Sequence, residues 1–284
     1  MVHTGLHNKV VLITGANHGI GAATARAFAA EGAAVLINYL RMPSMGRYAG
    51  GEAELDQYDT MRAKSADEVV QAIRALGGRA EAVEADLATI PLLFDGTEAL
   101  LGPVDVLVNN ADHCEQSTFI PASQIGPEVV ASDGYPTYTV TAEEHDRHFA
   151  VNSRALALMM AEFARRRIER GIHWGRIITM STDGAPGFNG TISYGASKYA
   201  AESYTRAAAL ELGKYGITAN IISPGPTQTG WIRPELEEAI INGTPMGRVG
   251  QPEDIADVIV FLASEQARWV TAQMISVSGG RRIF

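Results

Sequence analysis

Short apolar, β-branched runs alternate with longer helical stretches along the whole chain. Seven runs predict buried strands, at residues 9–14, 33–39, 79–86, 104–109, 176–181, 218–223 and 273–277. The stretches between them predict helices, at 19–31, 65–76, 91–101, 141–170, 193–214 and 252–263. Regular alternation of this kind is typical of a parallel sheet with helices on both faces. The pattern therefore predicts an α/β protein with a doubly wound, seven-stranded parallel sheet in three layers, built as a single domain over residues 1–284.

Composition limits the class of protein further. The chain has 284 residues, of which 46% are hydrophobic and 19% charged, which is ordinary for a globular enzyme. A net charge of −9 disfavours nucleic-acid binding, and no apolar run approaches the ~18 residues of a membrane span. The amino terminus has no signal-peptide pattern, and a single cysteine, Cys114, excludes an internal disulfide. We therefore expect a cytoplasmic protein that acts on a small molecule.

Tyr194 and Lys198 are the first candidates for catalysis. On a helix, residues four apart share a face, so the phenol and the ammonium point into the same space. A free phenol has a pKa near ~10, and roughly 4 kcal/mol of differential stabilisation would bring it to ~7. Lys198 supplies a cation for that purpose, although such a pair is often only a solvated one.

A glycine-rich turn near the amino terminus is the second candidate site. Gly15, Gly19 and Gly21 follow a predicted strand and open a predicted helix. Missing side chains at such a turn let the backbone approach a pyrophosphate at the helix amino terminus, as in Rossmann-type dinucleotide sites. An ordinary strand-to-helix turn is the alternative.

Together these motifs resemble the classical short-chain dehydrogenases/reductases, such as the 3-oxoacyl-carrier-protein reductases. The similarity covers nearly the whole chain and rests on the glycine turn from Thr14 to Gly21, Asp86-Leu87, Asn109-Asn110-Ala111, Asn152, Ser181, Tyr194, Lys198, Ser223-Pro224-Gly225, Thr229 and the stretch from Arg248 to Asp254 that leads to Gly279-Gly280. Three residues between Tyr and Lys favour this branch over its enoyl-reductase relatives, which have six.

The resemblance implies a hydride transfer between a nicotinamide and a carbonyl or secondary alcohol. It also implies that Tyr194 is the general acid/base and that Ser181 hydrogen-bonds the substrate carbonyl. Lys198 would hold the nicotinamide ribose and depress the pKa of Tyr194, while Asn152 would anchor a water relay. A nucleotide-binding regulator that has lost turnover is the alternative, since a sensor needs only the glycine turn.

The cofactor is expected to be NADP(H), with NAD(H) possible. Relatives that use NAD usually have an acidic residue where Tyr39 stands, whereas Arg41 offers a fork suited to phosphate. His18 lies at a position that is often basic in NADP-using relatives. The residues expected to bind the cofactor are Gly15, Asn17, His18, Gly19, Ile20, Gly21, Tyr39, Arg41, Asp86, Leu87, Asn110, Ala111, Tyr194, Lys198, Pro224, Gly225, Thr227 and Thr229.

The chain departs from the family pattern at one residue and in two segments. Asp112 stands where glycine is usual and adds a carboxylate beside the cofactor. Residues 42–64 and 113–140 are too long for ordinary connections and follow strands at the ligand-binding edge. We expect the first segment near the adenosine and the second as a cover over the substrate, with surface decoration as the alternative.

Other features predict structure rather than chemistry. Glu144, His145 and His148 are interpreted as a solvated helix face, and no metal site is expected. The alanine-rich helix around Tyr194 builds a dimer interface in relatives, so a homodimer or homotetramer is expected.

Overall fold

A seven-stranded parallel sheet forms the centre of the protein. The computed structural model describes residues 4–42, 57–126, 129, 131 and 134–281. The sheet has the order β3-β2-β1-β4-β7-β8-β9. Its strands are β1 (Val10–Ile13), β2 (Ala34–Tyr39), β3 (Arg79–Glu84), β4 (Val106–Asn109), β7 (Gly175–Met180), β8 (Ile217–Pro224) and β9 (Met274–Val277). The seven predicted strands and the doubly wound Rossmann-type class are confirmed.

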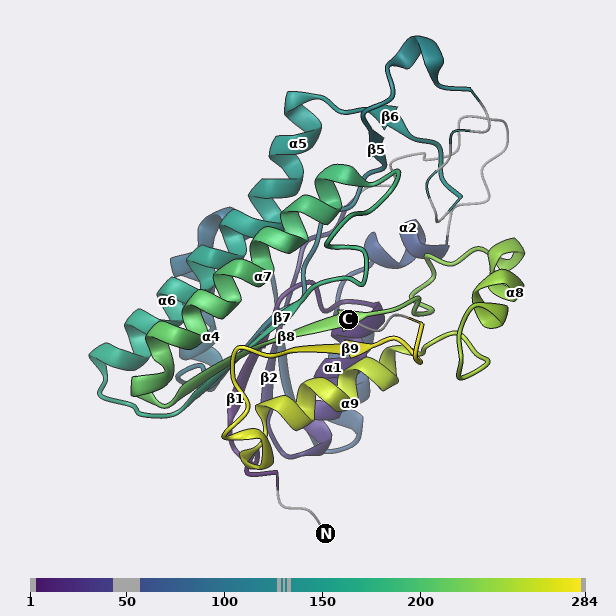
Figure 1. Ribbon diagram of the computed structural model, residues 1–284. Helices are drawn as coiled ribbons and strands as arrows, with labels where there is room; N and C mark the ends of the chain where they lie inside the picture. Colours follow the sequence, from purple (N-terminus) through teal and green to yellow (C-terminus); the bar gives the residue numbers. More distant parts are fainter. Residues whose placement is uncertain (1–3, 43–56, 127–128, 130, 132–133, 282–284) are drawn as a thin grey trace.

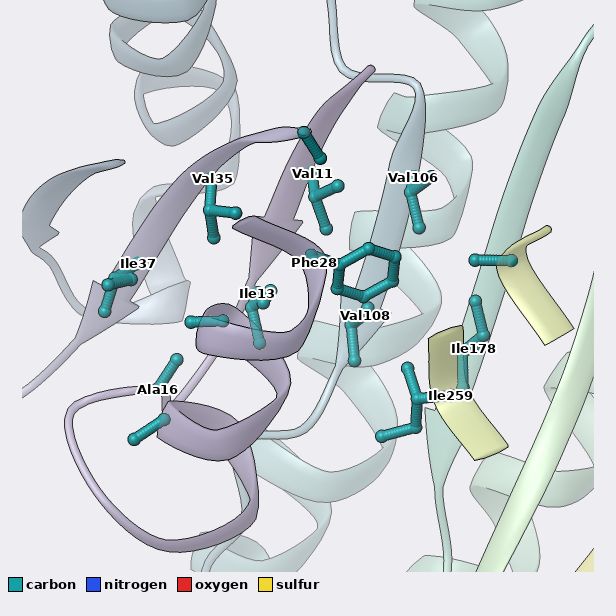
Figure 2. Packing of buried hydrophobic residues seen from close by; sticks show 14 of the residues in the cluster. Val11, Ile13, Ala16, Phe28, Val35, Ile37, Val106, Val108, Ile178 and Ile259 are labelled. Carbon is teal, nitrogen blue, oxygen red and sulfur yellow. The ribbon is translucent and has the colours of Figure 1, made fainter. Parts of the chain in front are cut away.

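Helices cover both faces of this sheet (Figure 1). One layer contains α1 (Gly19–Ala30), α3 (Asp67–Ala75) and α9 (Pro252–Ala263), and the other contains α4 (Ile90–Leu101), α6 (Leu156–Glu169) and α7 (Ile192–Leu212). Strand alternation assigns side chains to the layers, because Val11 and Ile13 pack with Phe28 of α1, whereas Leu12 packs with Phe94 and Phe163. Figure 2 shows the Phe28 ring over the first layer's core.

The order of the strands creates a crevice at one edge of the sheet. The chain winds outward from β1 through β2 to β3, then returns to the other side of β1 at β4. Helices on the two sides therefore diverge beyond the carboxyl ends of β1 and β4. Ligands bind at such a reversal point in open α/β sheets.

The two long segments contain ordered structure that the apolar pattern did not predict. Described residues of the first segment include α2 (Gln57–Arg62), while 43–56 lie outside the described residues. The second segment forms a two-stranded parallel sheet of β5 (Ser117–Thr118) and β6 (Tyr138–Thr139) with a 3₁₀ turn, η2 (Ala122–Gln124). Strands of two residues are too short to produce a detectable period in the sequence.

The remaining elements connect or flank these layers. The stretch expected as one helix at 141–170 consists of α5 (Ala142–Phe149), a π-helical turn η3 (Ala150–Ala155) and α6. A further helix, α8 (Pro234–Asn242), follows β8, and 3₁₀ turns occur at η1 (Leu87–Thr89), η4 (Gly213–Tyr215) and η5 (Glu265–Ala267). Among the described residues, every helix is too short or too polar to cross a membrane.

Candidate active site

A cavity of about 980 Å³ occupies the crevice at the carboxyl ends of the strands. It is lined by most of the residues that the sequence singled out: Gly15, Asn17, His18, Gly19, Ile20, Gly21, Asp86, Leu87, Asn110, Ala111, Ser181, Tyr194, Lys198, Pro224, Gly225, Thr227 and Thr229. Tyr39, Arg41 and Asn152 are not among the lining residues that the structure describes. The fold thus brings the glycine turn and the Tyr–Lys pair into one space.

The glycine turn has the shape required to hold a dinucleotide phosphate. A Cβ on Gly15 would lie 2.7 Å from the Ala111 Cα, and one on Gly21 would lie 2.5 Å from the Gly15 carbonyl oxygen, so neither position tolerates a side chain. No side chain of the described residues caps α1, whose N-cap is His18. The backbone N–H groups in the first turn of α1 therefore face the cavity, where they can donate hydrogen bonds to an anion. These features fit a bound pyrophosphate.

Asn110 and Thr14 connect the glycine turn to the end of β4. The Asn110 amide donates to the carbonyls of Thr14 and Gly15 at 3.0 and 2.8 Å, and the Thr14 hydroxyl accepts from the backbone of Asn110 and Ala111, at 3.0 Å in each case. These bonds hold two strands that are distant in sequence at a constant separation across the reversal point. Asn110 is thus a support for the turn.

Tyr194 and Lys198 project from α7 toward the same carboxylate, that of Asp112. The Tyr194 hydroxyl donates to Asp112 Oδ2 at 3.3 Å, and Lys198 Nζ lies 3.8 Å from the same oxygen. The Lys198 ammonium also donates to the Met180 carbonyl at 3.1 Å and lies 5.7 Å from the centre of the Tyr194 ring. A proton donor, a cation and an acceptor therefore meet at one point of the cavity wall.

Burial and neighbouring negative groups set the acidity of this pair. Burial raises the pKa of Tyr194 well above its ordinary value, and Asp112, Cys114 and Tyr58 raise it further. Burial lowers the pKa of Lys198, against the opposing effect of Asp112. The surroundings of the Tyr194 phenol thus raise its pKa, where the family resemblance led us to expect a depressed value, because burial disfavours the charged phenolate and Asp112 adds a negative charge beside it.

Asn152 lies in the π-helical turn η3, behind the cavity. Its Oδ1 accepts from the backbone amide of His113 at 2.8 Å, and its Nδ2 donates to the His113 carbonyl at 2.8 Å and to Ser197 Oγ at 2.9 Å. π-Helical turns are frequent at functional sites, because they alter the ordinary helical hydrogen bonding. The side chain of Asn152 connects the segment after β4 to α7, close to Tyr194.

Ser181 and Thr182 both line the cavity, but their hydroxyl groups have different hydrogen-bond partners. The Ser181 hydroxyl is 4% exposed and donates its only hydrogen to Glu202 Oε1 at 2.7 Å. Thr182 follows it, lines the cavity and is half-buried. Its oxygen accepts from the Gly184 amide at 3.3 Å, which leaves its hydrogen for donation to a ligand. The Ser181 hydroxyl, which follows the end of β7, is therefore bonded to Glu202 of α7.

The interpretation of Glu144 and His148 as a solvated face was wrong. His148 is fully buried, its Nε2 accepts from the Glu115 amide at 3.0 Å, and its Nδ1 bonds the Glu144 carbonyl at 2.9 Å. These partners require a neutral ring with the proton on Nδ1. Glu144 Oε2 accepts from Ser193 Oγ at 2.8 Å, so the network supports the start of α7. Among the described residues, no His/Cys/Asp/Glu group could hold a metal ion.

The end of β2 presents different side chains from those expected. Tyr39 is buried, and the Arg41 guanidinium binds Glu84, with Nε 3.0 Å from each carboxylate oxygen. Arg62 of α2 lines the cavity instead and lies 3.7 Å from Asp59. Arg62 lies in the segment 42–64, which the sequence placed near the adenosine, and was one of the basic residues next in line after Arg41 for the phosphate contact.

Four aromatic side chains lie in contact with one another beside the cavity, and three of them line it: His18, Tyr58 and Trp231. Tyr58 of α2 lies edge-on to His18 of the glycine turn at 5.2 Å and to Trp231 at 4.9 Å, between ring centres. Tyr135 of the second long segment lies 5.2 Å from Trp231 and is 1% exposed. Of the described residues of that segment, only His113 and Cys114 line the cavity. The second segment therefore contacts Trp231 through Tyr135, while Tyr58 of α2 connects Trp231 to His18 of the glycine turn.

Comparisons with known proteins agree with this geometry. A family model described as enoyl-(acyl carrier protein) reductase matches residues 15–282. The chain is 33% identical over 278 residues to the uncharacterized oxidoreductase YjdA of Bacillus subtilis, covering 96% of each chain. It is also 33% identical over 291 residues to the hydroxynaphthalene reductase arp2 of Aspergillus fumigatus, covering 95% of this chain and 91% of that protein. The protein therefore belongs to the short-chain dehydrogenase/reductase family of oxidoreductases.

Solved structures show the same fold. The angucycline C-6 ketoreductase LanV with bound NADP superimposes with a TM-score of 0.74 at 30% identity, covering 98% of this chain and 97% of that one. A putative gluconate dehydrogenase from Agrobacterium tumefaciens has a TM-score of 0.75 at 27% identity, covering 97% and 96%. The description of the family model names enoyl reductases, so assignment to the classical, ketone-reducing branch stays a prediction.

Proposed function

We propose that this protein is an NADP(H)-dependent oxidoreductase that interconverts a ketone and a secondary alcohol. The convergence of Tyr194 and Lys198 on one wall of the cavity, beside the glycine turn, is the observation that carries the proposal. LanV, with bound NADP, and the hydroxynaphthalene reductase support the reductase assignment. Loss of NADPH absorbance in the presence of a ketone panel tests it. Cofactor binding without oxidation of any ketone would instead support a regulator.

Each residue has a distinct role in the proposed reaction. When bound, the nicotinamide supplies the hydride. Tyr194 donates the proton to the carbonyl oxygen, and the Lys198 ammonium lies close enough to stabilise the resulting phenolate. We propose the Thr182 hydroxyl, in place of Ser181, as the donor to the carbonyl oxygen, since it lines the cavity and its hydrogen is available. Asn152 positions the segment after β4, next to Asp112.

The proposed phosphate contact for NADP(H) is Arg62, with His18 beside it in the cavity wall. Both side chains line the cavity, and Arg62 is one of the charges that lower the pKa of His18, after burial. A neutral His18 can donate one hydrogen bond, but only Arg62 supplies positive charge. Arg62 takes the place of Arg41 in this proposal because Arg62 lines the cavity, whereas Arg41 is not a lining residue and its guanidinium binds Glu84.

Substituting Arg62 should weaken the binding of NADPH but not that of NADH. We expect Arg62→Ala to weaken NADPH binding by roughly 1.5 to 3 kcal/mol, the range for a hydrogen bond to a charged group, and to change NADH binding little. Fluorescence titration with each cofactor measures the effect. Arg41→Ala is the matched control and should leave both affinities nearly unchanged. Equal losses for NADPH and NADH in Arg62→Ala would contradict the assignment.

The raised pKa of Tyr194 predicts a strong pH dependence in one direction of reaction. Alcohol oxidation needs the phenolate as base, so its rate should rise about tenfold per pH unit below the phenol pKa. Ketone reduction uses the protonated phenol and should not show this rise. Asp112→Asn removes a negative charge that raises the phenol pKa, so the oxidation curve should shift to lower pH.

The measurement is kcat/KM for alcohol oxidation against pH in both proteins. Cys114 and Tyr58 also raise the phenol pKa, Lys198 faces the ring at 5.7 Å, and the neutral His148 ring lies 6.5 Å from it. Because Asp112→Asn leaves these groups unchanged, a shift of the pH curve reports the effect of the Asp112 charge alone. An unshifted curve, or one moved to higher pH, would show that Asp112 does not raise the pKa of the Tyr194 phenol.

We also propose assembly through α7 into a homodimer or homotetramer. The helix exposes Tyr199, Tyr204 and Leu210, which are 54%, 49% and 82% accessible. Such large apolar side chains on one helix are typical of a surface that a second copy covers.

A further inference from the structure

Asp112 is a charged group at a place where the reaction disfavours negative charge. Its Oδ2 lies 3.3 Å from the phenol oxygen of Tyr194, the atom that must approach the reacting carbonyl to within about 3 Å. The carboxylate is therefore within roughly 6 Å of the oxygen that becomes an alkoxide. At an effective dielectric constant of ~20, two unit charges at that distance repel by an amount worth up to about a hundredfold in rate.

Neither the backbone geometry nor the ion pair with Lys198 accounts for a carboxylate at position 112. Relatives usually have glycine at this position. Asp112 does not have a positive φ, so a left-handed backbone conformation does not explain why aspartate stands there. Its side chain is 34% exposed at the cavity wall, where a ligand can reach it. Lys198 lies 3.8 Å away, but its ammonium also donates to the Met180 carbonyl, and the family resemblance implies that it holds the nicotinamide ribose.

We propose that Asp112 accepts a hydrogen bond from a substrate hydroxyl on the carbon next to the reacting carbonyl. The substrate class is then an α-hydroxy ketone, or a vicinal diol in the reverse direction. This inference rests on the proposed ketone reduction. An adjacent hydroxyl lies about 3 Å from the carbonyl oxygen, which places its hydrogen between that oxygen and the carboxylate. The bound hydroxyl screens the repulsion and fixes which carbonyl of the substrate faces Tyr194.

The cavity wall around this point suits a ring-bearing ketone as a probe. Phe188 and Trp231 line it, and the Phe188 ring lies 6.1 Å from that of Tyr194. 2-Hydroxyacetophenone and propiophenone form a matched pair, because they differ only in a hydroxyl where the second has a methyl group.

The experiment compares kcat/KM for these two ketones with NADPH. We expect the wild-type protein to prefer 2-hydroxyacetophenone by about tenfold or more, the effect of one hydrogen bond to a charged acceptor. Asp112→Ala should abolish the preference, by losing activity on the hydroxy ketone and gaining it on propiophenone. Asp112→Asn keeps the shape and an acceptor oxygen without the charge, so its preference should be intermediate.

A binding measurement separates this inference from the proposed function. Calorimetry on the protein with NADP should show 1-phenyl-1,2-ethanediol binding more tightly than 1-phenyl-1-propanol, and Asp112→Ala should remove the difference. If neither ketone is reduced but this difference is found, the proposed function fails and the hydroxyl contact stands. Equal preferences in wild type and Asp112→Ala, in both assays, overturn the hydroxyl contact. Stronger activity on 2-aminoacetophenone than on the hydroxy ketone also overturns it, in favour of a cationic substrate.

Discussion

Tyr194→Phe should lower turnover by a factor of order 10² or more while leaving NADPH affinity nearly unchanged. The substitution removes the only atom of Tyr194 that can donate a proton, and general acid catalysis is worth about 10²–10⁴ in rate. The phenol oxygen faces the cavity beside Asp112, whereas the ring packs 6.1 Å from Phe188. Phenylalanine preserves that packing. Steady-state kinetics on a reduced ketone, with NADPH titration alongside, measure both quantities.

Tyr199 provides a matched control on the same helix. Its side chain is 54% exposed, five residues beyond Tyr194, so Tyr199→Phe should not change turnover. If Tyr194→Phe turned over at the wild-type rate, the proton would come from another group and the proposed mechanism would be wrong.

Thr182→Ala should lower turnover by about 10²-fold, the effect of removing one donor to a developing oxyanion. The same truncation at Ser181 should act on stability instead. The Ser181 hydroxyl donates to Glu202, which is 1% exposed, and removing it leaves a buried carboxylate oxygen without that donor. We expect Ser181→Ala to reduce the free energy of unfolding by about 1–3 kcal/mol while kcat stays near the wild-type value.

Turnover and urea unfolding measured on both variants distinguish the two residues. Thr182→Ser keeps a hydroxyl at the cavity wall and should recover most of the activity lost in Thr182→Ala. The opposite pattern, with turnover lost in Ser181→Ala and retained in Thr182→Ala, would show that Ser181, and not Thr182, donates to the carbonyl oxygen.

The sheet was predictable because its signal is local and repeated. A strand buried on both faces is a continuous apolar run, so Val10–Ile13 and Val106–Asn109 are visible in the sequence without knowledge of their neighbours. The glycine turn was predictable for a related reason, since Gly15 and Gly21 occupy positions where a Cβ would meet backbone within 3 Å.

Side-chain direction at the ends of strands was not predictable to the residue. Tyr39 and Leu40 are adjacent, yet of the two only Leu40 lines the cavity. Ser181 and Thr182 are also adjacent and both line the cavity, yet the Ser181 hydroxyl donates to Glu202. Successive residues of a strand face opposite ways, so an error of one in the register reverses the assignment. Motif spacing alone does not detect such an error.

By itself, the sequence determined the α/β class, the seven parallel strands, the glycine turn and the pairing of Tyr194 with Lys198 on one helix face. Each depends on residues within a few positions of one another. Only the tertiary structure decided which charged and polar groups meet: Asp112 meets Tyr194 and Lys198 at the cavity, where Arg62 also lies, whereas Arg41 meets Glu84, and neither of these two is a lining residue. Those pairings join segments up to 86 residues apart, from 112 to 198, and electrostatic interactions depend on distance in space rather than along the chain.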